Sequence, residues 1–453
     1  MKFKDIIINA FHVKELRKKL FMTLLLIIIF RVGCFIPVPG LTEGAFSELA
    51  NNGMFRLYDM LSGGAFQQVS LFAMTISPYI NASIIVQLLT VAIPIFERWQ
   101  KEGPEGRKKL SMVTKITTLI LAVFQSVMMY FNIQSATYNV FAASGEFDIF
   151  TFLLVVLSFT AGTSVLMWLG EKITETGIGN GISMIIFAGI VAGAPSAALL
   201  LFNIVAGRPL NPDNPASALS AVLPVRIIYV VAILVVFLAV ILAVVWVEGG
   251  ERRIPVQYAK RVVGRKVYGG QNTNIPIKVN SSGVLPIIFA MSMLQFPATI
   301  VAFIGKSSST TGFTGFINSF SQGQGWGYII VYALLIVGFT FFYNIVYFDP
   351  VDIANNLKKN GGFVPGLRPG APTAEYIKKA STRVTWFGAM FLAILAVAPS
   401  LIQKIISYFS ADIASINLWF GGTTVLILVG VALETVRQLE SQLLMRNYKG
   451  FLD

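Results

Sequence analysis

Long apolar runs separated by polar loops dominate the chain between residues 20 and 438. Lipid offers no hydrogen-bond partner to a peptide group, so a chain that crosses a membrane in such runs must form helices. A helix needs roughly 20 residues to cross the hydrocarbon, and each run is about that long. The pattern predicts membrane-spanning helices over residues 20–38, 71–96, 111–133, 150–170, 182–204, 222–247, 284–304, 327–348, 384–403 and 418–438.

The composition supports a polytopic membrane protein. Hydrophobic residues make up 55% of the 453 positions, and the mean hydropathy is +0.71, above the range of soluble domains. Runs this dense leave no room for a large soluble domain. Cys34 and His12 are the only residues of their types, which excludes an internal disulfide and does not favour a thiol or imidazole metal cluster. Arg31 interrupts the first run and no Ala-x-Ala site follows it, so we expect a retained helix rather than a signal peptide.

Basic residues predict the orientation of the chain. The net charge is +13, and Lys and Arg concentrate in the N-terminus, the C-terminus and every second loop. The positive-inside rule therefore places both termini and these loops in the cytoplasm. Two of the cytoplasmic loops, 247–282 and 349–383, are long. In the first, Ile254, Val256 and Tyr258, and later residues 275–279, alternate with polar neighbours, which predicts a small β-hairpin.

A weak internal repeat relates two of the predicted helices. Pro78, Ile80, Ala82 and Gln87 recur with the same spacing as Pro286, Ile288, Ala290 and Gln295. The two helices are five apart in the predicted order. Since five is odd, two copies of a five-helix unit would insert upside down relative to each other, as in known inverted-repeat membrane proteins.

The residues exclude some functions and leave others open. No catalytic constellation or metal-ligand spacing is present, so an intramembrane enzyme is not favoured. A secondary transporter with inverted repeats is an alternative, but such proteins usually carry an ionisable relay near the midplane. Arg31 is the clear ionisable residue at membrane depth, since Lys115 and Glu434 lie near helix ends. Arg31 either shapes the field of a pore or makes a structural contact between helices.

Three groups of residues have two readings each. The pairs Ile76/Ile80 and Ile182/Ile186 each lie on one helix face, either as ordinary core or lipid-facing residues or as the lining of a pore. The semi-apolar segment 57–70 is either an external loop or a re-entrant stretch that closes a cavity. Polar residues in the two repeat-related helices either join neighbouring helices or mark an interface that opens; they are Asn81, Ser83, Gln87, Ser292 and Gln295.

Four separated stretches resemble one family closely. They are Ile29–Gly33, Ser77–Ile85, Gly177–Ser183 and Gly362–Gly370. In this order they are similar to bacterial SecY, the channel subunit of the Sec protein translocase, and the resemblance runs over nearly the whole chain.

The resemblance implies an all-α polytopic fold with a central hourglass pore. Ten helices would form two inverted five-helix halves, 1–206 and 207–453, hinged at the loop between the fifth and sixth helices. The narrowest point would be a ring of isoleucines: Ile76, Ile80, Ile182, Ile186, Ile288 and Ile427. Segment 57–70 would be a plug, including Leu61, Ser62, Gly63, Gly64, Ala65 and Phe66. The helices that carry Asn81, Ser83, Gln87, Ser292 and Gln295 would form a lateral gate toward lipid.

The resemblance also implies partners. Basic residues of the two long cytoplasmic loops would dock the SecA motor or ribosomal RNA; they are Arg252, Arg253, Lys260, Arg261, Arg265, Lys266, Lys358, Lys359 and Arg368. SecE and SecG would be companion subunits, and signal sequences, nascent polypeptides and membrane lipid would meet at the gate. No cofactor is expected. The implied function is passage of unfolded polypeptides across the bacterial cytoplasmic membrane, with sideways release of membrane segments.

Overall fold

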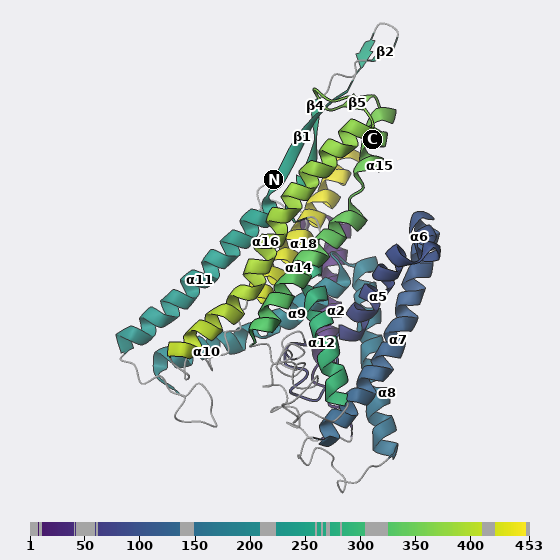
Figure 1. Ribbon diagram of the computed structural model, residues 1–453. Helices are drawn as coiled ribbons and strands as arrows, with labels where there is room; N and C mark the ends of the chain where they lie inside the picture. Colours follow the sequence, from purple (N-terminus) through teal and green to yellow (C-terminus); the bar gives the residue numbers. More distant parts are fainter. Residues whose placement is uncertain are drawn as a thin grey trace.

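The computed structural model describes residues 11–39, 62–135, 149–208, 223–258, 272–280, 283–303, 325–409 and 422–449, two short strands at 261–263 and 266–268, and positions 8, 41 and 59. Within these ranges the chain is mostly helical (Figure 1). The helices of the first half of the chain are α2 (Lys14–Gly33), α5 (Ser77–Ala92), α6 (Pro94–Lys101), α7 (Pro104–Ser135), α8 (Ile149–Thr176), α9 (Gly181–Ala192) and α10 (Ala194–Ala206). The later helices are α11 (Leu223–Gly249), α12 (Leu285–Phe303), α14 (Trp326–Tyr347), α15 (Pro350–Lys359), α16 (Ala371–Phe409) and α18 (Gly422–Lys449).

Helices occupy most of every predicted span, which confirms the helical fold class. By length and composition, the described residues contain six helices able to cross a membrane, or seven if the bent pair α5–α6 counts as one span. Ten crossings therefore stay a prediction. Some boundaries were wrong. The second span begins at Ser77 and not at residue 71, and α16 begins at Ala371, well before the predicted residue 384.

A proline divides the second predicted span into two separate helices. The axes of α5 and α6 differ by 99°, and the break falls at Ile93, whose extended backbone (φ −117°, ψ 120°) precedes Pro94. The ring of a proline clashes with a helical residue before it, which forces that residue into the extended region. The fifth predicted span is divided into α9 and α10 at Gly193, whose backbone stays in the helical region, so the two helices together still form one span, Gly181–Ala206.

The repeat-related helices α5 and α12 have matching surroundings. Each begins one residue before its proline. Ile80 and Ile288 are each 6% exposed, and Ala82 and Ala290 are each fully buried. Equal burial at equivalent positions is expected if α5 and α12 are corresponding helices of two repeated units. The matching spacing in the sequence thus corresponds to matching burial in the fold.

The predicted hairpin is present and gains a third strand, whereas its location on the cytoplasmic side stays a prediction. Strand β1 (Glu251–Tyr258) pairs antiparallel with β4 (Asn272–Lys278) along its length. Strand β5 (Gly362–Phe363), from the second long loop, pairs with the other edge of β1. The alternating Ile254, Val256 and Ile277 are buried against α15 and α16. Between β1 and β4, β2 (Arg261–Val263) and β3 (Lys266–Tyr268) form a second small hairpin. The sheet lies at one end of the helices (Figure 1).

The main hydrophobic core lies where the helices converge. It joins buried side chains of α2, α5, α8, α9, α12, α14, α16 and α18, together with the single residue Val244 of α11. By contrast, α11 is strongly apolar yet mostly exposed, with Leu234, Val235, Leu238 and Trp246 on its surface. An apolar helix surface that the chain itself does not cover is typical of contact with lipid or another membrane helix.

Candidate functional site

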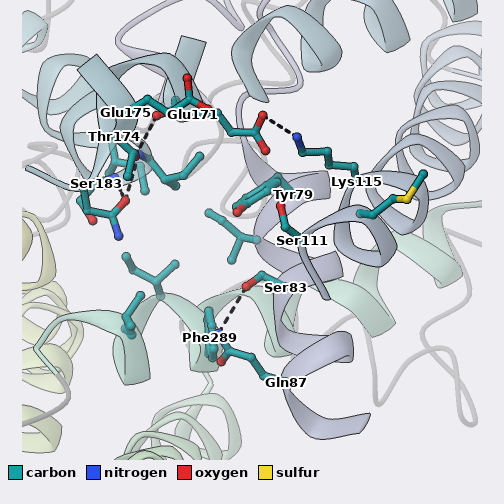
Figure 2. A pocket seen from close by; sticks show the side chains of 18 of the residues that line it. Tyr79, Ser83, Gln87, Ser111, Lys115, Glu171, Thr174, Glu175, Ser183 and Phe289 are labelled. Carbon is teal, nitrogen blue, oxygen red and sulfur yellow. Dashed lines mark hydrogen bonds and ion pairs between the residues drawn. The ribbon is translucent and has the colours of Figure 1, made fainter. Parts of the chain in front are cut away.

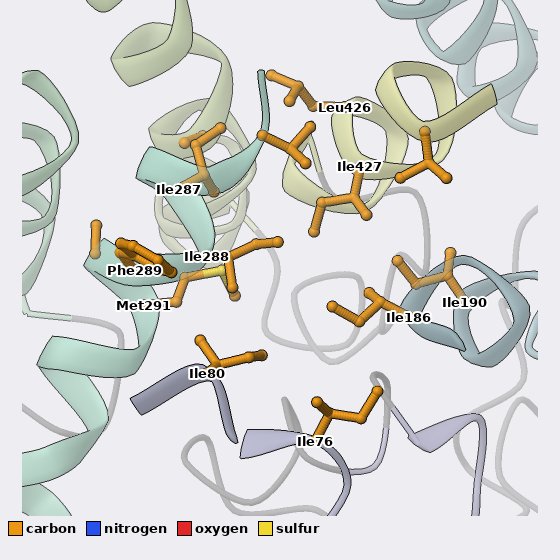
Figure 3. Close-up of a cluster of buried hydrophobic side chains, with 14 of the residues drawn as sticks. Ile76, Ile80, Ile186, Ile190, Ile287, Ile288, Phe289, Met291, Leu426 and Ile427 are labelled. Atoms are coloured by element: carbon orange, nitrogen blue, oxygen red, sulfur yellow. The ribbon is translucent and has the colours of Figure 1, made fainter. Parts of the chain in front are cut away.

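The six isoleucines that the sequence singled out lie together. Ile76, Ile80, Ile186, Ile288 and Ile427 are buried in the main core cluster, and Ile182 is half-buried against it. They come from α5 and its N-cap, α9, α12 and α18, which are far apart in the chain. Figure 3 shows Ile80 and Ile288 facing each other, with Ile186 and Ile427 directed toward the same region. The residues are therefore brought together; their role as a pore ring stays a prediction.

A cavity of about 810 Å³ opens on one side of these isoleucines. Its apolar part includes Ile80, Ile182, Ile186 and Ile288, and the rest of its wall is largely polar. Figure 2 shows Tyr79, Ser83, Ser111, Thr174 and Ser183 around it, contributed by α5, α7, α8 and α9. A wide cavity with many polar residues in its wall thus lies against branched apolar side chains.

An ion pair lies in the wall of this cavity. Lys115 Nζ of α7 is 2.8 Å from Glu171 Oε2 of α8 (Figure 2). Both side chains are partly exposed, so the pair contributes little to stability, about 0–1 kcal/mol for such pairs. The sequence pointed to Lys115 as a residue near a helix end but gave no partner for it. The pair leaves this part of the wall polar without a net charge.

The folded segment 62–70 lies on the other side of the isoleucines. A small cavity of about 10 Å³, close to the size of one water molecule, is lined by Ile76, Ile80, Ile186 and by Ser62 of this segment. Ile80 and Ile186 line both cavities. These two isoleucines therefore lie between the large cavity and the predicted plug. Leu61 lies outside the described residues, whereas Ala65 and Phe66 are buried in two different core clusters.

Arg31 holds the predicted plug segment to α2. Its Nη1 donates a hydrogen bond to the Gly63 carbonyl oxygen at 3.0 Å, and Cys34 Sγ lies 3.7 Å from the Ser62 carbonyl oxygen. Gly63 has φ +65°, and a side chain there would press on Arg31 and on the Gly189 carbonyl oxygen of α9. The sequence left two readings for Arg31; the structure gives it a contact, and the contact is with the segment that faces the isoleucines.

The Gly177–Ser183 stretch fixes where α9 begins. Asn180 caps the helix by accepting hydrogen bonds from the backbone of Ile182 and Ser183. The Ile178 N–H donates to Thr23 Oγ1 of α2 at 3.0 Å, and the Gly179 N–H donates to Gln438 Oε1 of α18 at 2.6 Å. A helix whose first turn is tied to two others presents Ile182 and Ile186 in a defined direction.

Four of the five predicted gate residues have described side chains. On α5, Gln87 Nε2 donates to Ser83 Oγ at 3.4 Å, and both residues line the large cavity. Asn81 is half-buried on the same helix, and Ser292 is buried on α12. The side chain of Gln295 lies outside the described part. Helices α5 and α12 contact each other.

One further residue at this interface was missed by the sequence analysis. Tyr343 of α14 donates a hydrogen bond from its hydroxyl to Gln87 Oε1. In the sequence it follows Phe341 and Phe342 inside an apolar run, where an aromatic residue is ordinary, and Gln87 is 256 positions away. No local pattern signals such a contact.

The predicted docking residues that are described lie around the three-stranded sheet. Arg252, Arg253, Lys358, Lys359 and Arg368 are exposed. Arg253 is paired with Glu251 of the same strand, with 2.6 Å between the charged groups. Arg261 and Lys266 are in β2 and β3, for which only the backbone is described, and Lys260 and Arg265 lie outside the described residues. Strand pairing joins the two long loops into one surface.

Together, the fold and the site define a polytopic helical membrane protein of the channel type, in which branched apolar side chains lie between a large cavity and the segment 62–70. Among the described residues no cluster of His, Cys, Asp and Glu is suited to a metal ion.

Comparisons with known proteins give the family. The model of the SecY family matches residues 70–436. A protein translocase subunit SecY from Streptomyces galbus is 43% identical, over 98% of each chain. A solved SecY structure concerned with the plug domain has a TM-score of 0.61 at 19% identity, covering 94% of this chain and 92% of that one. Sec61 in a canine ribosome–channel complex has a TM-score of 0.55 at 18% identity, with the same coverage.

The chain belongs to the SecY family of protein translocase subunits. Its function is therefore that of a protein-translocation channel, and the secondary transporter considered from the sequence is not favoured. The family consists of channel subunits rather than enzymes. These two solved channels share less than 20% sequence identity with this chain, so their similarity shows the fold alone.

Proposed function

We propose that unfolded secretory polypeptides pass between the six isoleucines, which we call the isoleucine ring. The observation that carries the proposal is their position, with the large cavity on one side and the segment 62–70 on the other. A crossing chain exposes a new peptide group and a new side chain at every step. Branched apolar side chains offer it no hydrogen-bonding site, so it slides past without being held. At rest a dry apolar constriction obstructs water and ions.

We propose that segment 57–70 is the plug, and that it closes the external side of the ring. Its contacts with Arg31 and with α9 support this role. In a solved SecY channel with the same fold, the plug domain stabilises the closed state of the channel and maintains a membrane seal. Displacing the segment would then open the far side of the ring.

Helices α5 and α12 form the lateral gate in this proposal. Opening between them would expose each segment of the crossing chain to lipid. A Leu or Ile residue gains a few tenths of a kcal/mol there, whereas Asp, Lys or Arg at the centre costs about 2.5–3.5 kcal/mol. Partitioning on this scale releases apolar segments sideways and lets polar ones pass.

The remaining assignments concern partners and orientation. The chain would lie in the bacterial cytoplasmic membrane with both termini in the cytoplasm, alongside SecE and SecG, and would take its energy from SecA or the ribosome. The exposed basic residues on the sheet suit an acidic motor surface or the phosphates of ribosomal RNA. Relatives of this fold include a channel bound to a ribosome.

Crosslinking of an arrested precursor tests the proposal. A secretory precursor stalled in native membranes should crosslink to Ile80→Cys and Ile427→Cys, because both side chains would touch the passing chain. Ile85→Cys is the matched control, since Ile85 lies on the same helix α5 but is 38% exposed and lines neither cavity. Cys34, the only natural cysteine, is buried and adds little background. Absence of crosslinks at both ring positions, over several stall lengths, would remove them from the pore.

A further inference from the structure

A hydrogen bond joins the two predicted halves at the gate. Its donor is the Tyr343 hydroxyl on α14 and its acceptor is Gln87 Oε1 on α5. Gln87 is also bonded to Ser83, one turn earlier on the same helix. Figure 2 shows Gln87 and Ser83 at the edge of the large cavity, beside Phe289. The bond therefore lies where the cavity meets the interface between α5 and α12.

The Tyr343 side chain is held by the C-terminal half. It is 1% exposed, and its ring packs against Phe289 of α12, with 5.3 Å between ring centroids. Phe289 in turn contacts Phe339 of α14 at 6.0 Å, and α12 and α14 pack along one another. Because these rings interlock, α12 and α14 move together, and the Tyr343 hydroxyl is presented as a fixed donor to α5.

Separation of α5 from α12 and α14 must break this bond. The hydroxyl and the amide then need new partners, and a buried polar group left unpaired costs more than an average hydrogen bond gains. Gln87 lines the cavity and can find water there, whereas the Tyr343 hydroxyl, which is buried, gains a water partner only when water reaches the interface. An apolar segment that enters the gate supplies none, so its transfer to lipid has to outweigh the lost bond. The bond consequently raises the hydrophobicity that a segment needs to open the gate.

We infer that Tyr343 is a specificity-determining residue of the channel: its hydrogen bond to Gln87 sets the threshold of segment hydrophobicity for gate opening. The inference rests on the proposed lateral gate between α5 and α12. It assigns the threshold to a hydroxyl on a third helix, α14. This hydroxyl is not part of the isoleucine ring.

Removal of the hydroxyl alone tests the inference. Tyr343→Phe keeps the ring packing, so the chain should accumulate normally in membranes. Secretion of a reporter with a weakened, less hydrophobic signal sequence should rise about fivefold, the effect of one average hydrogen bond on an open–closed equilibrium. Secretion with a strong signal should not change, because that signal already exceeds the threshold. A purely structural role for Tyr343 would affect both reporters alike.

A matched control and a double variant isolate the bond. Tyr332→Phe removes a buried hydroxyl from the same helix α14, one that has no hydrogen-bond partner within the described structure, and should leave both reporters unchanged. Gln87→Leu should raise secretion of the weak reporter as Tyr343→Phe does. The variant carrying both changes should match either single one, since the bond can be lost only once. Independent, additive effects would overturn the inference.

A second measurement does not depend on the hydroxyl. In Gln87→Cys/Tyr343→Cys, the long side chains that bridged the gap are replaced by short ones, so a bismaleimide with a short spacer suits the pair better than a direct disulfide. The crosslinked channel should secrete neither reporter, whereas the same channel without the reagent should secrete the strong one. If the crosslink forms and secretion continues, this contact does not open during transport and the inference fails. If Tyr343→Phe alone has no effect while crosslinking blocks secretion, the gate stands and the threshold role is wrong.

Discussion

At the scale of single residues, two adjacent glycines in the predicted plug allow the effect of backbone strain to be distinguished from the effect of a side-chain contact. Gly63 and Gly64 both have positive φ, +65° and +89°. An added Cβ at Gly63 would lie 2.7 Å from Arg31 Nη1 and from the Gly189 carbonyl oxygen, whereas nothing lies within 4 Å of one at Gly64. Alanine in the left-handed region costs roughly 1–2 kcal/mol at either position, so the difference between the variants reports the contact.

Gly63→Ala should therefore loosen the plug and raise the resting ion conductance of the channel well above that of Gly64→Ala. The measurement is single-channel or bilayer conductance of the purified translocase without precursor. Arg31→Met should also raise the conductance, because it removes the donor to the Gly63 carbonyl oxygen. Equal conductances for the two alanine variants would mean that segment 62–70 does not seal through these contacts.

At the scale of elements, the sheet at the end of the helices makes one surface of two loops. β5 pairs with β1 at Gln257↔Phe363 and Tyr258↔Gly362, and Gly362 packs so tightly on the Tyr258 ring that a Cβ would lie 2.9 Å from it. This pairing holds the turn that carries Arg368 beside the basic strand β1. Both loops should then engage a partner together.

Arg368→Glu should reduce SecA-driven export of a precursor several-fold, because reversing a charge at an interface slows association with an oppositely charged partner. Lys378→Glu is the control, since Lys378 is also exposed but lies on α16. Export is measured with inverted membrane vesicles, purified SecA and ATP, at low and high salt. Undiminished export by Arg368→Glu at low salt would argue against docking at this turn.

The elements also show what the sequence could and could not predict. Apolar run length predicted where helices lie, because membrane helices must satisfy their own backbone within one segment. Alternation predicted β1 and β4; in β1 the buried Ile254 and Val256 show the period of two. The pattern could not give the 99° turn at Ile93, since run length carries no direction. It missed β5 because two residues are too few for a period.

The candidate site, too, could be predicted only in part from the sequence. Spacing on one helix, as for Ile76 and Ile80, predicted which side chains share a face, but convergence of four helices on one point required the family resemblance. Contacts between distant residues left no local trace in the sequence. The bond from Arg31 to the plug and the bond from Tyr343 to Gln87 therefore came from the structure.

At the scale of the whole molecule, α18 makes hydrogen bonds to both predicted halves. The partners of Arg437, Gln438 and Gln442 lie outside the gate helices α5 and α12. Arg437 Nη2 donates to the Glu248 carbonyl oxygen of α11 at 2.7 Å. The next residue, Gln438, accepts from the Gly179 N–H before α9, and Gln442 accepts from Lys19 of α2. If the halves part between α5 and α12, these contacts along α18 remain available to hold the molecule together and to keep Ile427 opposite α9.

Gln438→Leu should therefore weaken the contact between the two predicted halves and lower the stability of the folded protein. It leaves the Gly179 N–H without its acceptor, which costs about 1–3 kcal/mol for a buried donor, while Gln438→Glu retains an acceptor oxygen at the same position. In detergent, the apparent unfolding temperature of purified Gln438→Leu should fall below those of the unaltered protein and of Gln438→Glu. The resting conductance should rise as well, because α9 carries Ile182 and Ile186 of the ring. If Gln438→Leu unfolds and conducts like the unaltered channel, the position of α9 is set by other contacts, such as the bond from Ile178 to Thr23, and α18 does not join the halves.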